Sequence, residues 1–147
     1  MTVVEETFVS RQNGRTSVKN VPDTPLGRMY REHIDMILKK DIDGLLNQYT
    51  DDALLISSFE KKPVIYRGRD QLRDHFQGIL GIQGLETEIG FWGETENPQT
   101  LMITEQITMQ TADGEAQMRF ADSWVLRDGR IAIHFAGMVQ YPDGSLS

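Results

Sequence analysis

Ionisable side chains stand inside apolar segments near the C-terminal end of this chain. Asp122 lies between Phe120 and Trp124 in the segment AQMRFADSWVLR, and His134 lies in RIAIHFAGMVQY. A carboxylate in the interior of a strand is costly unless it has a partner or a role. Near neutral pH a histidine can both accept and donate a proton. One hypothesis is therefore acid–base catalysis by Asp122, with His33 or His134 as its partner.

Glu105 joins this group through the expected pairing of strands. Asp113-Gly114 separates two segments of strand length, and Asp-Gly between such segments is a hairpin signal. A two-residue turn there sets Glu105 opposite Asp122 and matches the apolar side chains on either side. It also predicts two apolar pairs, Met109 with Met118 and Ile107 with Phe120.

The next hairpin leaves two registers open. A three-residue loop over 127–129 sets Asp122 opposite His134, which aligns Glu105, Asp122 and His134 in one row across three strands. A two-residue loop would instead set Asp122 opposite Phe135.

Both faces of the last two strands are apolar, so one face must cover a cavity and the other needs a partner, which predicts a homodimer. Phe120, Trp124 and Leu126 fall on one face, and Val125, Ile131, Ile133 and Phe135 on the other.

Three helices are expected to precede these strands. Thr24 can cap a helix in which Pro25 takes the first position, and apolar residues then recur at helical spacing to about Lys40. A second short helix begins at Asp41, with Leu45, Leu46 and Tyr49 on its buried side, and a third begins near Arg69. Two short strands, in ALLISSF and PVIYRG, lie between the second and third helices. A four-strand antiparallel meander comes last, so helices should cover one face of a curved sheet.

Composition limits the possible functions. The 147 residues suit one domain, the net charge is −7, and no basic patch suggests a nucleic-acid partner. No apolar run is long enough for a membrane span, and no Cys is present for a thiolate or a disulfide. A cytoplasmic location is consistent with this composition. We expect a flexible N-terminal arm over 1–23, a domain over 24–141 and a C-terminal tail over 142–147.

Three stretches carry a resemblance to a known superfamily. KKDIDGLLNQYTDDALLISS, YRGRDQLRDHF and DSWVLRDGRIAIHF resemble the nuclear transport factor 2-like proteins, nearest to SnoaL-like polyketide cyclases and ketosteroid isomerases. The resemblance covers roughly residues 26–139. It implies an α+β cystatin-like cone, with three N-terminal helices packed on a curved antiparallel sheet that encloses a pocket. It also implies a homodimer formed through the outer face of the sheet.

The resemblance assigns roles to single positions. In ketosteroid isomerases an acid on the penultimate strand stays protonated and donates to an oxyanion, and Asp122 falls at that position. The hydrogen-bonding Tyr of the first helix falls at His33, and the general-base Asp of the first strand falls at Ser57. Because Ser is no base at neutral pH, this departure argues against steroid isomerisation by the family mechanism. We expect the ligand-binding residues to be Tyr30, Ser57, Glu105, Met109, Met118, Phe120, Trp124 and Met138.

Three functions remain open from the sequence. The first is a SnoaL-like enzyme that uses Asp122, His33 and His134 to cyclise, isomerise or dehydrate a small hydrophobic or carbonyl compound, without a cofactor. The second is a small-ligand-binding domain without chemistry, which Ser57 in place of a base favours. The third is an oligomerisation domain. No metal site is expected, because no ligand motif such as His-x-x-x-His is present.

Overall fold

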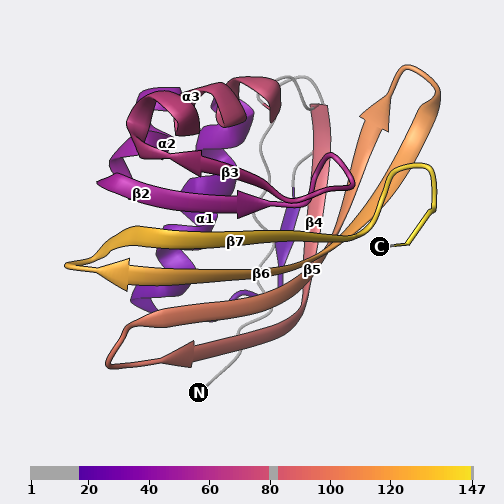
Figure 1. Cartoon of the computed structure of the whole chain (residues 1–147). Helices are drawn as coiled ribbons and strands as arrows, with labels where there is room; N and C mark the ends of the chain where they lie inside the picture. Colours follow the sequence, from indigo (N-terminus) through magenta and orange to yellow (C-terminus); the bar gives the residue numbers. More distant parts are fainter. Residues whose placement is uncertain (1–16, 80–82, 147) are drawn as a thin grey trace.

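A computed structural model describes residues 17–79 and 83–146 of the chain, which form three helices and seven strands. None of the helices in these ranges is long and apolar enough to cross a membrane. Figure 1 shows the elements coloured along the sequence. They are β1 (Ser17–Lys19), α1 (Pro25–Lys39), α2 (Ile42–Asn47), β2 (Tyr49–Ser57), β3 (Val64–Arg67), α3 (Gly68–Ile79), β4 (Gln83–Thr95), β5 (Thr100–Thr111), β6 (Gly114–Arg127) and β7 (Arg130–Gln140).

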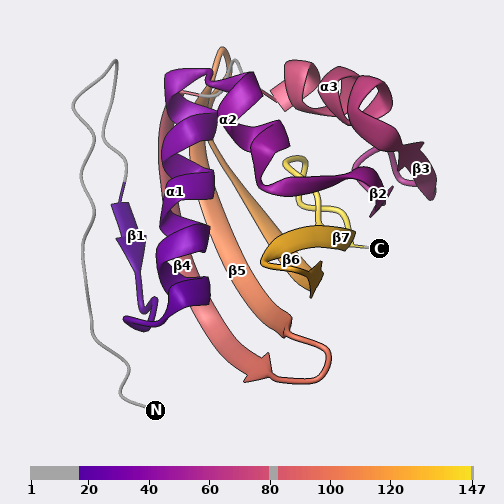
Figure 2. The same ribbon diagram turned by 90° about the vertical axis from the view of Figure 1, so that its left-hand side faces the viewer.

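The seven strands form one curved sheet in the order β1-β4-β5-β6-β7-β2-β3. The meander β4 to β7 is antiparallel, as predicted. The sheet as a whole is mixed, because β1 runs parallel to β4 and β2 runs parallel to β7. The expectation of a purely antiparallel sheet is therefore corrected, whereas the α+β cone itself is confirmed. The three helices lie on one side of the sheet (Figure 2).

The two N-terminal helices begin where their capping residues predict. The backbone N–H of Gly27 donates to Thr24 Oγ1 at 3.0 Å, and Pro25 opens α1. The backbone N–H of Gly44 donates to Asp41 Oδ1 at 3.0 Å, which starts α2. The prediction that Tyr49 lies on the second helix is wrong, because Tyr49 is the first residue of β2.

The hydrophobic core fills the space between the helices and the inner face of the sheet. Leu26 and Ile34 of α1, Leu45 of α2 and Phe76 of α3 pack towards inner-face residues such as Leu55 of β2. Each of these side chains is at most 4 % exposed. Apolar burial on this scale is the main favourable term in folding, and it fixes the helices that carry the polar residues described below.

The N-terminal arm contributes to the fold within the described residues. β1 pairs with β4 through Val18 and Thr87, and the side chains of Val18 and Val21 are fully buried in the core. The arm predicted over 1–23 is therefore wrong for residues 17–23, while residues 1–16 lie outside the described residues. A three-residue strand carries too little pattern to be recognised from alternation, and its stability comes from pairing and burial.

The β5–β6 register differs from the predicted one by two residues. The turn residues are Ala112 and Asp113, so Thr111 pairs with Gly114 and Glu105 lies opposite Phe120 rather than Asp122. Since side chains alternate with a period of two, this shift changes every partner but leaves every residue on its predicted face. Glu105 and Asp122 become diagonal neighbours on the inner face, still within reach of each other.

The β6–β7 hairpin combines features of both registers. Its turn has the two residues Asp128 and Gly129, both with positive φ (53° and 77°), as the common two-residue hairpin turn requires. A bulge between the pairs Leu126/Ile131 and Val125/Ile133 then adds one residue to β7. Asp122 consequently lies opposite Ala136, and the predicted pairing of Asp122 with His134 is wrong.

The same bulge decides which side chains face inwards. His134 pairs with Trp124 and stays on the inner face beside Asp122. Ile131, which simple alternation placed on the outer face, is fully buried on the inner one. Without the extra residue, His134 would turn outwards, because a one-residue slip moves a side chain to the opposite face.

Removing the buried side chain of β1 should destabilise the domain. We expect Val18→Ala to lower the free energy of unfolding by about 2 kcal/mol, because it deletes two methyl groups from a closed core. Lys19→Ala, at the exposed neighbouring position, should change it by less than about 0.5 kcal/mol. Urea denaturation measures both variants. Equal stabilities for Val18→Ala and the wild type would show that β1 is not part of the cooperative fold.

Candidate functional site

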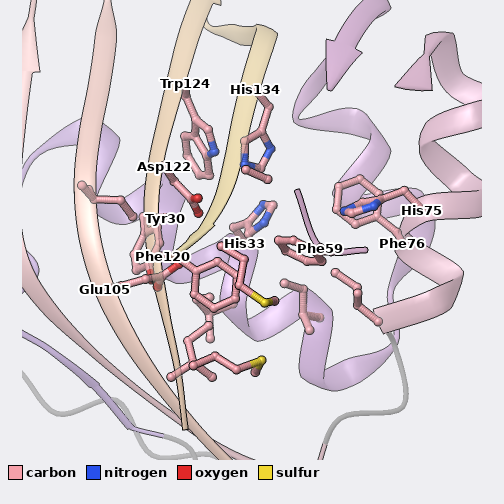
Figure 3. A pocket seen from close by; sticks show the side chains of 18 of the residues that line it. Tyr30, His33, Phe59, His75, Phe76, Glu105, Phe120, Asp122, Trp124 and His134 are labelled. Carbon is pink, nitrogen blue, oxygen red and sulfur yellow. The ribbon is translucent and has the colours of Figure 1, made fainter. Parts of the chain in front are cut away.

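A cavity of about 280 Å³ lies between the helices and the inner face of β5, β6 and β7. Its wall is mostly apolar, and no Lys or Arg lines it among the described residues. The polar groups Asp122, His33 and His134 gather towards one end, and aromatic side chains such as Phe59 and Phe120 lie beyond them (Figure 3). A concave, mostly apolar space with a few converging polar groups is the usual form of a small-molecule site.

The structure brings together ten of the eleven residues predicted for the site. Asp122, His33, His134, Tyr30, Glu105, Met109, Met118, Phe120, Trp124 and Met138 all line the cavity. Ser57 does not. It is buried in β2, where its hydroxyl accepts a hydrogen bond from the backbone N–H of Phe59 at 3.2 Å. The chain turns after Ser57, and Phe59 lines the cavity instead.

Glu105 accepts hydrogen bonds from two hydroxyl groups. The Tyr30 hydroxyl on α1 donates to Glu105 Oε2, and the Thr87 hydroxyl on β4 donates to the same oxygen at 2.9 Å. The Tyr30 ring is held in turn by an edge-on contact with Trp92, with 5.6 Å between the ring centroids. A carboxylate supported by several donors is stabilised in its ionised form, even where water is excluded.

Asp122 has one backbone partner and one carboxyl partner. Its Oδ1 accepts the backbone N–H of Gly137 at 3.0 Å, and its other interaction is a hydrogen bond with Glu105. Gly137 is required here by close approach, because a Cβ at this position would lie 2.6 Å from the backbone oxygen of Ala121. The predicted partnership of Asp122 with a histidine is therefore corrected: its titratable partner is Glu105.

The two carboxyls share one proton. Burial raises the pKa of Asp122 well above its usual range, and the negative charge of Glu105 raises it further. Burial also raises the pKa of Glu105, but the hydrogen bonds from Tyr30, Thr87 and Asp122 oppose that effect. Two carboxylates in one water-poor site cannot both ionise cheaply. These directions favour the proton on Asp122 and the charge on Glu105.

The buried histidines are neutral at the same pH. His33 Nδ1 lies 2.9 Å from Gln48 Oε1, and burial lowers the pKa of His33 to about 4. His134 Nδ1 lies 2.7 Å from the Tyr49 hydroxyl, and burial lowers the pKa of His134 well below its ordinary value. His75, which the sequence suggested to be a surface or structural residue, is buried and lines the cavity, with its pKa lowered by burial to about 4.

Among the described residues, no group of three or more His, Asp or Glu side chains is arranged to hold a metal ion. The arrangement suits proton transfer instead. It offers two interacting carboxyls with raised pKa values and imidazoles whose pKa values are lowered, all lining a largely apolar cavity. Such groups can donate a proton to, and remove one from, a bound molecule.

A family comparison agrees with this geometry. Residues 30–134 match the profile of the SnoaL-like domain, which is more than two thirds of the chain. The chain belongs to the SnoaL-like domain family. The match begins at Tyr30 and ends at His134, so it spans all the polar residues at the end of the cavity described above. No curated protein sequence is similar enough to the chain to count as a relative.

Solved structures share the fold of this SnoaL-like domain at low sequence identity. An NTF2-like protein of unknown function from Exiguobacterium sp. 255-15 is 18% identical, with a TM-score of 0.61 over 78% of this chain and 98% of that one. An LEH-like epoxide hydrolase of M. tuberculosis is 15% identical, with a TM-score of 0.59 over 76% and 80%. The epoxide hydrolase/cyclase-like enzyme SalBIII is 14% identical, with a TM-score of 0.58 over 78% and 94%.

Sequence reasoning missed the residues that orient the site. Thr87, Gln48 and Tyr49 each hold a predicted residue of the SnoaL-like pocket, but none of them was assigned a role. Thr87 lies on β4, whose bulge between Ile89 and Phe91 hides a simple alternation. Gln48 and Tyr49 sit at the junction of α2 and β2, where the periodicity changes. Tyr30 was recognisable because it lies one helical turn before His33.

The shared proton predicts how stability depends on pH. Folded Asp122 keeps its proton where an unfolded Asp loses it, so its contribution to stability falls as pH rises above about 4. The Asp122→Asn variant has no titrating carboxyl at this position, so it lacks this dependence of stability on pH. Between about pH 5 and pH 7, the wild type should therefore lose stability relative to Asp122→Asn by up to about 1.4 kcal/mol per pH unit, until the raised pKa is passed.

Urea denaturation at several pH values measures this difference. The buried histidines act in the opposite direction, because groups with a lowered pKa lose their contribution as pH falls below about 6.5. They are common to both proteins and cancel in the comparison. Glu96→Gln, at an exposed position, controls for the loss of a surface carboxylate. A pH-independent difference between the wild type and Asp122→Asn would mean that Asp122 is ionised in the folded protein.

Proposed function

We propose that this SnoaL-like protein is a cofactor-independent enzyme. It binds a small, neutral, largely apolar molecule and moves protons on it, in a cyclisation, an isomerisation, a dehydration or the opening of a strained ring. The observation that carries the proposal is the Asp122 carboxyl, hydrogen-bonded to Glu105 at the wall of an apolar cavity, where its surroundings raise its pKa. Holding a buried and a partly buried carboxyl side by side costs stability, and a group kept at that cost is a candidate for function.

The carboxyl pair can serve as acid and base in one cycle. Asp122 donates its proton to an oxygen of the substrate, which leaves two adjacent carboxylates. Their repulsion favours recovery of a proton, so the pair then takes up the proton that the substrate loses from carbon or oxygen. Protons balance over the cycle without any cofactor. Tyr30 and Thr87 keep Glu105 ionised and in place throughout.

The cavity wall supports a neutral substrate. No Lys or Arg lines it among the described residues, and Glu105 already places a negative charge at its polar end. A carboxylate or phosphate group would meet that charge without a counter-ion. The names of two structural neighbours refer to epoxide hydrolysis and to pyran ring formation. Epoxides are therefore the first substrates to try.

Turnover by the wild type and by Asp122→Asn tests the proposal. The substrates are small terpenoid epoxides, β,γ-unsaturated cyclic ketones and tertiary alcohols, with products detected by gas chromatography and mass spectrometry. We expect turnover in one of these classes and a loss of at least about 100-fold in Asp122→Asn, which keeps the shape but not the proton. Displacement of an apolar fluorescent dye should be unchanged, because the cavity wall is intact.

Two results would oppose an enzymatic role. Turnover that is equal in the wild type and Asp122→Asn would remove Asp122 from the mechanism. Dye displacement without turnover in any class would favour the alternative of a non-catalytic ligand-binding domain, which the same apolar cavity also supports. Loss of dye binding in both proteins would favour an oligomerisation domain.

We also propose that the protein acts as a homodimer joined through the outer face of the sheet. Phe91, Met102, Phe135 and Val139 share that face and are between 42% and 54% exposed. Met102 and Phe135 both flank Ser123 in one row across the strands, and the row continues to Ile65 on β3. An apolar stripe across a sheet face usually marks a surface covered by another molecule.

Light scattering after size exclusion measures the oligomeric state. We expect a dimer at micromolar concentration and a shift to monomer in Phe135→Glu, because a charge would be buried at the centre of the interface. Leu146→Glu makes the same change at an exposed apolar residue beyond the last strand, and it should remain dimeric. A wild type that is monomeric, or a Phe135→Glu variant that is still a dimer, contradicts this interface.

A further inference from the structure

Two histidines at the polar end of the cavity take no part in the carboxyl pair. His33 on α1 and His134 on β7 have ring centroids 6.3 Å apart and meet edge to face. Both are at most 6% exposed, and both pack against Trp124. Figure 3 shows their rings next to the same space that the Asp122 carboxyl faces. Their hydrogen bonds determine which nitrogen of each ring carries the proton.

The tautomer of His33 follows from Gln48. The Gln48 side-chain N–H donates to the backbone oxygen of Met29 at 3.0 Å. A carbonyl can only accept, so the amide cannot be turned round, and Gln48 Oε1 must face His33 Nδ1 at 2.9 Å. His33 Nδ1 therefore carries the proton and donates it. The lone pair of His33 Nε2 is left as an acceptor.

The tautomer of His134 follows from Tyr49. If His134 Nδ1 donated to Tyr49, the buried Tyr49 O–H and His134 Nε2 would both lack a partner within the described residues. If Tyr49 donates to Nδ1 instead, only Nε2 lacks one. Each unpartnered buried polar group costs about 1–3 kcal/mol, which favours the second arrangement. His134 Nε2 then carries a proton that no described residue accepts.

We propose that His33 and His134 form a hydroxyl-binding subsite: His134 Nε2–H donates to a hydroxyl oxygen of the ligand, and His33 Nε2 accepts the hydroxyl proton. The subsite deepens the proposed function, on which it rests for the identity of the cavity as the substrate site. A hydroxyl matches the pair because it both donates and accepts. The substrate or product class is thus a neutral alcohol or enol on an apolar skeleton.

Other polar groups match the subsite less well. A carbonyl or ether oxygen satisfies His134 but leaves the His33 lone pair without a donor. An ammonium group offers donors only, and a carboxylate offers acceptors only. A plain hydrocarbon leaves the unpaired Nε2–H of His134 as it is in the free protein. Discrimination therefore depends mainly on the buried His134 Nε2–H, which otherwise lacks a partner among the described residues. A site built around such a group rejects ligands without a matching atom strongly.

Nitrogen NMR on the uniformly ¹⁵N-labelled full chain tests the two tautomers without any ligand. We expect His33 as the Nδ1–H form and His134 as the Nε2–H form at neutral pH. Tyr49→Phe should release His134 into a mixture of tautomers and leave His33 unchanged. Gln48→Leu should do the reverse. The opposite tautomer at either ring in the wild type overturns the subsite.

Matched probes test hydroxyl recognition. The probes are 1,2,3,4-tetrahydronaphthalen-2-ol and tetralin, which differ by one hydroxyl, and calorimetry measures their dissociation constants. The wild type should bind the alcohol at least as tightly as tetralin. The double variant Tyr49→Phe/His134→Phe replaces both hydrogen-bond partners with apolar rings of similar shape, so it should fold. It should bind the alcohol about tenfold or more weakly than tetralin, because the hydroxyl oxygen loses the His134 donor and enters an apolar wall.

The outcomes separate this subsite from the catalytic proposal. If both the wild type and the double variant bind tetralin more tightly than the alcohol, and by the same factor, the subsite is wrong, whatever reaction the protein catalyses. Asp122→Asn should keep both the alcohol preference and the two tautomers, since neither histidine bonds to Asp122. Retained preference with no turnover of any substrate would leave the subsite standing and would overturn the proposed enzyme.

Discussion

Two carboxyl groups lie side by side on the concave face of the sheet, Glu105 buried and Asp122 partly buried, and this constraint governs the organisation of the site. Glu105 and Asp122 are diagonal neighbours on adjacent strands, and no Lys or Arg lines the cavity among the described residues. Without a cation to balance them, they can remain in the core only by sharing a proton and by using every available donor. Tyr30, Thr87 and the backbone N–H of Gly137 supply those donors.

The same constraint connects the site to the rest of the fold. Tyr30 reaches Glu105 only because α1 begins at its Thr24 cap and lies against β4. Asp122 accepts the N–H of Gly137 where β6 and β7 approach closely, because a Cβ at residue 137 would clash with the backbone oxygen of Ala121, and the bulge before Ile133 sets this register. The bulge also sets His134 on the inner face. Small features of the backbone therefore decide where the charges and protons lie.

Much of this arrangement follows from the sequence, and the exceptions have physical reasons. Helix starts were predictable from Thr24-Pro25 and Asp41, because capping is a local interaction. The inner position of Asp122 was predictable from alternation, which tolerates a two-residue error in register. The bulge before Ile133, the pairing of β1 and the location of Ser57 were not. The β1 pairing joins strands distant in sequence, and the bulge depends on how β6 and β7 pack in the folded sheet, so a local pattern encodes neither.

The protonation state of Asp122 is the central claim, and carbon NMR of side-chain carboxyls measures it directly. In protein labelled with ¹³C at the carboxyl carbons of Asp and Glu, the Asp122 signal is assigned by its loss in Asp122→Asn. At pH 7 it should remain at the position of a neutral carboxylic acid, while Glu105 shows the position of a carboxylate. Carboxylate positions for both residues at that pH would contradict the shared proton and the catalytic proposal built on it.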